Sequence, residues 1–218
     1  MVTLEVSNLY MNNKSIGGFS MKNRKIVLML SSIIFISAII AICFFVGARS
    51  KTNPKDEVVG AKLVGEYNSL EDLTEASILI IDGTKVSEGK PILLKDKYDI
   101  VAGGYTLSTI RVDKIVSDHT GINIKVNDTI TVLENEYYNK ETNTNYHIEG
   151  YKKMKNKKSY MLFLTYASEN QWYIPTGVIY GKIPHDAKEE ILVEDYDGSD
   201  IVVKKIRDTA YKNYKIGK

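Results

Sequence analysis

The chain has 218 residues, with 29 Lys or Arg and 27 Asp or Glu, so its formal net charge is +2 at pH 7. This length accommodates one ordinary domain and a short tether. Four of the basic residues and one acidic residue lie within residues 1–48, which leaves the rest of the chain at about −1. Such a balanced charge provides no global field for nucleic acid or lipid headgroups. We therefore expect no nucleic-acid partner.

An uncharged run, residues 26–48, is the strongest single signal in the sequence. Its 23 residues read IVLMLSSIIFISAIIAICFFVGA. As a helix the run would reach roughly 34 Å, enough to cross a hydrocarbon core of about 30 Å. A buried helix of a water-soluble domain would show a polar face, whereas this run offers only three serines. It predicts a single transmembrane helix.

Whether this helix is retained or cleaved depends on its length. Lys22, Arg24 and Lys25 form a basic segment before it, and Val46-Gly47-Ala48 fits a signal-peptidase site. The run is longer than the 7–15 apolar residues of secretory signals, which favours an uncleaved anchor over the alternative of cleavage. Long downstream domains cross the membrane largely regardless of charge, so we expect a cell-membrane protein with an extracytoplasmic C-terminal domain.

The segments on either side of the run are predicted to be simple. Residues 1–25 are expected to form a short cytoplasmic tail. Alternatively, translation starts at Met21, because Met21-Lys22-Asn23-Arg24-Lys25 reads as a signal start and Gly17-Gly18 can be encoded by a ribosome-binding sequence. Residues 49–66 are polar, contain Pro54, and predict a linker.

Residues 67–183 predict a mainly β domain, a small OB-like barrel with peripheral helices. Ser69 can cap a helical turn, with Asp72 three residues later. Apolar and alternating stretches then predict strands at residues 77–86, 92–94, 105–116, 129–133, 159–166, 172–174 and 178–183.

Three details of this barrel follow from the pattern. In residues 105–116 the inward side chains start on Tyr105 and Leu107 and shift to Ile110 and Val112, which predicts a bulge. The unbroken apolar content of 159–166 predicts a strand buried on both faces, and the polar residues 134–150 predict an exposed loop.

The C-terminal extension, residues 184–218, allows two structures. Asp197-Gly198 would suit a hairpin, but the longer periodicity of Val203, Ile206, Ala210 and Tyr214 favours a helix capped by Ser199.

The order of these motifs resembles a known group of proteins. The sequence shows SLEDL at residues 69–73, Gly-x-x-Val at 83–86, a strand that begins at Tyr105, NDTITV at 127–132, YMLFL at 160–164 and Gly-x-x-Tyr-Gly at 177–181. Together they resemble the exported, membrane-anchored domains of unknown function of Gram-positive bacteria. Their architecture is similar to the OB-like barrel of the tissue inhibitors of metalloproteinases. The resemblance implies a five- or six-stranded barrel but not the inhibitory chemistry. Those inhibitors chelate the protease metal through a disulfide-bonded N-terminal cysteine, and Cys43, the sole cysteine here, lies within the apolar run.

The sequence predicts no catalytic, metal or cofactor site. His119, His147 and His185 fall in predicted loops, without Gly-x-Ser-x-Gly or the His spacing of a zinc site. The acidic run 194–200 departs from a calcium loop in the positions of its glycine and of the last carboxylate, and predicts a solvated turn.

One basic segment is a candidate binding site. Between Tyr151 and Tyr160 stand five lysines: Lys152, Lys153, Lys155, Lys157 and Lys158. They fit a solvated loop whose lysines block edge pairing, or a contact with an anionic partner. OB folds bind single-stranded nucleic acid with such residues, but an extracytoplasmic domain rarely meets it. We therefore expect a non-enzymatic module that contacts a protein or an envelope polymer. The alternative is an envelope-directed hydrolase whose site the sequence does not mark.

Overall fold

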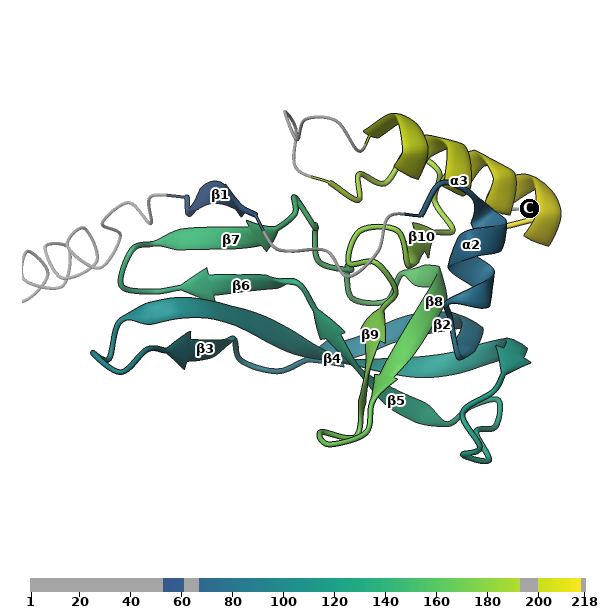
Figure 1. The fold of residues 1–218 in the computed structure, drawn as a ribbon, viewed down its shortest axis with the longest axis horizontal. Helices are drawn as coiled ribbons and strands as arrows, with labels where there is room; N and C mark the ends of the chain where they lie inside the picture. Colours follow the sequence, from purple (N-terminus) through teal and green to yellow (C-terminus); the bar gives the residue numbers. More distant parts are fainter. Residues whose placement is uncertain (1–52, 61–66, 193–199, 217–218) are drawn as a thin grey trace, which may run out of the picture. The chain divides into compact units, whose positions relative to one another are not determined.

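The computed structural model describes residues 53–60, 67–192 and 200–216, which belong to one compact unit, Asn53–Lys218 (Figure 1). The fold is mainly β, as the sequence predicts. The elements in chain order are β1 (Lys55–Val59), α2 (Leu70–Glu75), β2 (Leu79–Glu88), β3 (Ile92–Lys95), β4 (Val101–Asp118), β5 (Thr129–Glu134), β6 (Glu136–Asn139), β7 (Thr144–Ile148), β8 (Ser159–Ala167), β9 (Trp172–Pro175), β10 (Lys182–Pro184) and α3 (Asp200–Tyr214).

Five strands form a closed ring. Their order is β8, β2, β4, β5 and β9, and β9 pairs with β8 again. All pairs are antiparallel except β5 with β9, which join in parallel through Val132 and Tyr173. β10 pairs with residues 160–162 of β8, just before residues 164–167 of β8, which pair with β9. The last predicted strand, residues 178–183, is therefore wrong in extent, because residues 176–181 form turns that bring the chain back to β8.

The bulges of β4 lie at positions that the sequence pattern did not indicate. Thr106 and Ser108 are buried together with Ile110 and Val112, so the inward phase does not change after Leu107 as predicted. Both polar residues are accommodated because their hydroxyls donate hydrogen bonds, that of Thr106 to the carbonyl of Glu136. The register between β2 and β4 shifts instead next to Ile80, Asp82 and Lys85, which bends the two long strands.

A second, three-stranded sheet has the order β1, β7, β6. Residues 136–148 form its β6–β7 hairpin, so the prediction of an exposed loop over 134–150 is wrong. The polar sequence concealed buried positions: Tyr137 and Asn139 alternate on β6, and Thr144 and His147 are buried on β7. β1, which pairs in parallel with β7, is formed by residues within the predicted linker.

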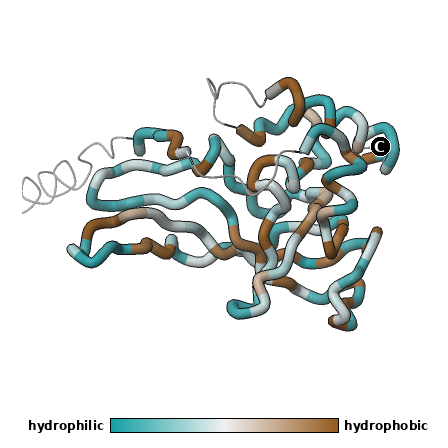
Figure 2. The backbone as a smooth tube through the Cα atoms, in the orientation of Figure 1, coloured by the Kyte–Doolittle hydropathy of each residue, from teal (hydrophilic) through white to brown (hydrophobic). Residues whose placement is uncertain are grey.

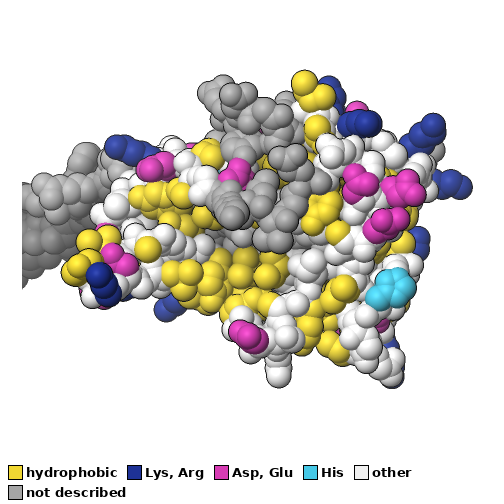
Figure 3. All heavy atoms as spheres, in the orientation of Figure 1, with side chains coloured by type: hydrophobic (Ala, Val, Ile, Leu, Met, Phe, Trp, Pro, Cys, Tyr) yellow, Lys and Arg dark blue, Asp and Glu magenta, His cyan; other side chains and the backbone are white. Residues whose placement is uncertain are grey.

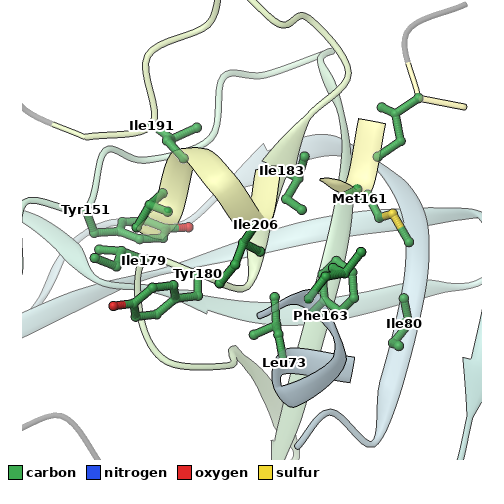
Figure 4. Packing of buried hydrophobic residues seen from close by; sticks show 14 residues of the cluster. Leu73, Ile80, Tyr151, Met161, Phe163, Ile179, Tyr180, Ile183, Ile191 and Ile206 are labelled. Atoms are coloured by element: carbon green, nitrogen blue, oxygen red, sulfur yellow. The ribbon is translucent and has the colours of Figure 1, made fainter. Parts of the chain in front are cut away.

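Two apolar cores flank the wall of the ring. The inner core, enclosed by the ring, contains alternate residues of the strands, among them Leu79, Ile81, Leu162 and Leu164. The residues between them on the same strands point outward against the helices, so β8 is buried on both faces as predicted. Figure 4 shows this outer core, which joins Leu73 of α2, Phe163 of β8 and Ile206 of α3.

Both predicted helices are present. The side chain of Ser69 accepts a hydrogen bond from the amide of Asp72 at 3.1 Å, which caps α2. α3 buries Val203, Ile206 and Ala210 on one face, as the periodicity predicts.

Several predictions fall outside the described residues. These are the tail, the transmembrane helix at 26–48, most of the acidic run and the Ser199 cap. Over the part of the chain that the structure describes, no helix is long and apolar enough to cross a membrane.

Candidate functional site

An open cavity of about 480 Å³ lies between the β4–β5 loop, β5 and the β8–β9 hairpin. We call it the β5–β9 groove. Its volume falls in the range of ordinary ligand sites, roughly 300–1,000 Å³. The groove is lined by Ile122, Asn123, Ile124, Asp128, Thr129, Ile130, Thr131, Tyr166, Gln171 and Tyr173.

Two tyrosines form the aromatic wall of the groove. Tyr166 of β8 and Tyr173 of β9 are cross-strand partners, and their ring centroids are 4.9 Å apart at an interplanar angle of 44°. Burial raises the pKa of the Tyr173 phenol, and the nearby Tyr166 and Asp118 add to this, so its hydroxyl stays protonated at neutral pH. Tyr173 is only 4% exposed, so the partly exposed ring of Tyr166 provides the accessible aromatic face of this wall.

The β4–β5 loop is held by its own short polar side chains. Asp118 accepts hydrogen bonds from the amide of Thr120 at 2.9 Å and from its hydroxyl at 2.6 Å. Asp128 accepts from the amide of Lys125 at 2.8 Å, and Asn127 takes a left-handed φ of 74°, which Asn tolerates well. The loop wall of the groove is therefore preformed.

The chemistry of the groove is polar and almost uncharged. Asp128 is the one charged side chain among the lining residues, whereas Asn123, Thr129, Thr131 and Gln171 offer neutral donors and acceptors. Neutral hydrogen-bonding groups beside aromatic rings suit an uncharged polar ligand, which needs orientation but no counter-charge.

A second feature, hidden in the interior, is a buried charge cluster centred on Lys85 and Glu134. The ammonium of Lys85 donates to Glu134 at 2.7 Å, to Glu88 at 2.6 Å and to the carbonyl of Met154 at 2.7 Å. Lys85 and Glu134 are both fully buried. This pair ties β2 to β5 and to the loop before β8.

Glu134 is saturated with donors. Besides Lys85 it accepts from the hydroxyl of Ser108, from the hydroxyl of Tyr151 at 3.1 Å and from the amide of Met154 at 2.5 Å. A carboxylate with four donors and no exposure has no lone pair left for a substrate. The cluster is therefore structural.

Lys182 of β10 is a second buried lysine beside this cluster. Its ammonium donates to the carbonyl of Lys152 and lies 3.9 Å from the centroid of the Tyr151 ring. Burial lowers the pKa of Lys182 to about 8, although the carboxylates of Glu134 and Glu136 oppose this. For the phenol of Tyr151, whose charged form is the deprotonated one, burial raises the pKa well above its usual value.

The sequence contained a signal for this cluster. Lys85 continues the inward alternation of Leu79, Ile81 and Gly83, and Glu134 continues that of Ile130 and Val132. The predicted strand 77–86 already contained Lys85, whereas the strand predicted over 129–133 ended one residue before Glu134. Extending that alternation by one step would have placed a carboxylate at an inward position.

His147 corrects the prediction that every histidine lies in a surface loop. It belongs to β7 and is 3% exposed. Nε2 lies 2.9 Å from Asp56 of β1, and Nδ1 lies 3.3 Å from Glu136 of β6. Burial lowers the pKa of His147, but its hydrogen bonds to Glu136 and Asp56 outweigh this and raise the pKa to about 9. The charged imidazole thus joins all three strands of the second sheet.

The other predicted features are placed as follows. His119 and His185 lie outside helices and strands, and His185 is 3.0 Å from Asp82. Within the described ranges, no three His, Cys, Asp or Glu side chains are grouped to hold a metal ion.

The five predicted lysines lie on the loop between β7 and β8 in two kinds of surroundings. Lys152 pairs with Glu190 at 2.6 Å, Lys153 with Glu88 at 3.2 Å, and Lys158 with Asp186 at 3.8 Å. Lys155 and Lys157 are exposed to solvent. Contact with an anionic partner stays a prediction. Because the other three lysines are in ion pairs, Lys155 and Lys157 are the two that we expect to make it.

We expect any anion binding by this loop to depend on those two residues. Replacing Lys155 and Lys157 with Gln should abolish retention of the domain from residue 53 onward, which lacks the predicted helix, on anionic wall polymer at low salt. Retention of the unchanged protein should weaken with salt, because the Debye length falls from about 10 Å at 0.1 M to about 3 Å at 1 M. Replacing the exposed Lys188 and Lys204 with Gln is the matched control. Equal retention of both variants would contradict a role for the loop.

Two comparisons with known proteins, one with family models and one with curated proteins, were made for the chain. No protein-family model matches it, and no curated protein matches its sequence. Its function must therefore be inferred from the geometry of the β5–β9 groove, the buried charge cluster and the lysine loop. Of these three, the groove combines preformed walls, access from solvent and groups able to orient a ligand.

Proposed function

We propose that the protein is a membrane-anchored, extracytoplasmic module that binds a neutral, polar polymer of the cell envelope, a glycan strand, in the β5–β9 groove. The observation that carries this proposal is the lining of that groove, in which the Tyr166–Tyr173 pair stands beside uncharged amides and hydroxyls. Aromatic rings cover the apolar faces of sugars, while amides and hydroxyls bond to their hydroxyl groups. The anchor is the predicted helix over residues 26–48.

The strand order supports the same reading. A five-stranded ring closed by one parallel pair fits the OB fold, and we infer an OB-like barrel in line with the resemblance to tissue-inhibitor domains. OB folds bind oligonucleotides and oligosaccharides on the face of their second and third strands. In this ring those strands are β4 and β5, and β5 lines the groove.

The alternative function, an envelope-directed hydrolase, is less well supported. Such an enzyme needs a reachable acid, base or nucleophile with a partner that shifts its reactivity. The groove offers one carboxylate, Asp128, whose Oδ2 already accepts the amide of Lys125. The buried pair Lys85–Glu134 has the charges but no access. Binding is therefore the function that the geometry favours.

Calorimetric titration with soluble wall glycan oligosaccharides tests the proposal. Tyr166→Ala should weaken binding roughly tenfold, because it removes the partly exposed ring of the wall. Tyr98→Ala, at the exposed turn between β3 and β4, is the matched control and should leave the affinity unchanged. Equal affinity of the two variants, or release of cleaved glycan, would refute the proposal.

A further inference from the structure

The turn between β3 and β4 presents an unusual set of apolar side chains to solvent. We call Leu94, Tyr98 and Ile100 the hairpin tip; they are 51%, 70% and 63% exposed. Figure 2 colours part of this hairpin as hydrophobic, and Figure 3 shows apolar and charged side chains together at that end.

The acidic residues of the turn are used within it. Asp96 accepts hydrogen bonds from the amides of Tyr98 at 2.8 Å and of Ile100 at 3.0 Å. Asp99 pairs with Lys95 at 2.9 Å. The carboxylates thus hold the turn in shape, while the apolar side chains make the outward surface.

The hairpin tip lies at the end of the domain where β1 begins. The amide of Lys55, the first residue of β1, donates to the carbonyl of Asn143 in the β6–β7 turn at 3.0 Å. β6 runs beside β4, with Thr106 bonded to the carbonyl of Glu136 at 2.7 Å. Figure 1 shows the β3–β4 and β6–β7 turns at the same end.

The chain length between the apolar run and β1 is short. Six residues, 49–54, separate them. Fully extended, they span at most roughly 20 Å. An anchored chain would therefore hold this end of the domain close to the bilayer, and such a tether gives even a weak contact a high effective concentration.

We propose that the hairpin tip rests in the headgroup region of the bilayer that holds the anchor. The proposal builds on the membrane anchor of the proposed function and names lipid as the partner of this surface. Tyr is favoured at membrane interfaces, because one end of its ring is apolar and the other polar. Lys95, which is paired with Asp99, and Lys97 flank the tip, and their aliphatic stems can lie in apolar surroundings while their charged groups stay among the headgroups.

This placement also orients the β5–β9 groove. β4 runs from the hairpin tip at Val101 to Asp118, where the groove loop begins. Its 18 residues correspond to roughly 55 Å of strand. Lipid contact at one end of β4 would direct the other end, with the groove, away from the membrane and toward the wall.

A quenching experiment on the full chain tests the contact. Cys43→Ser removes the one native thiol. A single cysteine at Lys97 then carries an environment-sensitive fluorophore, and the protein is reconstituted into phosphatidylcholine–phosphatidylglycerol vesicles that contain a headgroup-labelled quencher lipid. Lys125, exposed in the loop beyond the other end of β4, is the matched control position.

The probe at position 97 should lose about half of its emission and the probe at 125 almost none, since interfacial groups reach only about 5–10 Å into the headgroup boundary. Ile100→Glu should reduce the docked fraction about tenfold. Val126→Glu, a similar change of a residue that is 49% exposed, should have no effect.

The outcomes separate the two proposals. If the protein does not co-float with vesicles, the anchor fails, and the proposed function fails with it. If it co-floats but the two probes are quenched equally, the hairpin tip does not contact lipid, and its apolar side chains fit a protein partner instead.

Discussion

Replacing Glu134 with Leu should lower the free energy of unfolding by about 3–5 kcal/mol, the usual effect of removing one partner of a buried ion pair. The change leaves the ammonium of Lys85, which has no exposure, without its buried carboxylate. It also removes the acceptor of the Tyr151 hydroxyl and of the Met154 amide. Each such donor, once buried without a partner, costs about 1–3 kcal/mol more if the interior cannot adjust.

The double variant Lys85→Met, Glu134→Leu separates charge from packing. Apolar residues of similar volume often replace a buried pair at little cost, so the double variant should be more stable than Glu134→Leu alone. Urea unfolding can be followed through the single tryptophan, Trp172. Glu88→Gln, at the partly exposed partner of Lys85, is the control and should cost under about 1 kcal/mol. A loss under 1 kcal/mol for Glu134→Leu would mean that water or another side chain compensates Lys85.

This cluster marks the limit of what the sequence pattern could predict. Apolar runs and alternation predicted the strands of the ring, because each strand has at least one face against an apolar core. The same criterion ended β5 at residue 133, since a charged residue was taken to be outside. The cause is physical. A buried carboxylate is stable only if it accepts hydrogen bonds from donors elsewhere in the chain, and Ser108, Tyr151 and Met154 each lie at least 17 residues from Glu134.

The second sheet was hidden for a similar reason. Residues 134–150 are polar and rich in Asn and Tyr, a composition typical of loops. β7 is nevertheless stable because His147 and the tyrosines supply the buried contacts, and Tyr137 stacks on Tyr146 with centroids 5.1 Å apart. β1 needs partners that follow it by about ninety residues, such as His147 for Asp56. Local periodicity carries no information on such pairs.

The β5–β9 groove was not predicted, although most of its lining residues lie in or beside predicted strands. Asn127-Asp128 stands directly before the predicted strand 129–133, Tyr166 ends the predicted strand 159–166, and Tyr173 lies within the predicted strand 172–174. Their meeting depends on the closure of the ring, in which β9 pairs with β5 and β8 at once. Closure follows from strand order, which a pattern of burial does not specify.

His147 should make stability fall as the pH rises from 6.5 to 8. Its pKa is about 9 in the folded protein against 6.5 ordinarily, so the folded state keeps a proton that the unfolded chain has lost. The stabilisation is therefore complete below pH 6.5 and is lost as the pH rises through 9. Between pH 6.5 and 8 we expect a loss of about 1–2 kcal/mol, at most 1.36 kcal/mol per pH unit, reduced because Asp56 is exposed to solvent.

Lys182 should make the stability rise rather than fall with pH, in a higher pH interval than His147. Its folded pKa of about 8 lies below the ordinary 10.5, so the unfolded chain holds the extra proton and stability rises with pH in that interval. The two slopes overlap between pH 8 and 9, where the profile should flatten. Above pH 10 the buried tyrosines keep their protons in the folded state and lower stability again, as Tyr151 illustrates.

Urea unfolding at fixed ionic strength between pH 6 and 10 measures this profile. His147→Gln keeps a hydrogen-bonding side chain but no titration, so its free energy of unfolding should be flat between pH 6.5 and 8. His119→Gln, at an exposed position, should retain the slope of the unchanged protein. A slope that persists in His147→Gln would assign the titration to another group and would remove the charged imidazole as the link between β1, β6 and β7. Loss of the slope in that variant alone would show that the sheet of β1, β7 and β6 is held by one protonated histidine.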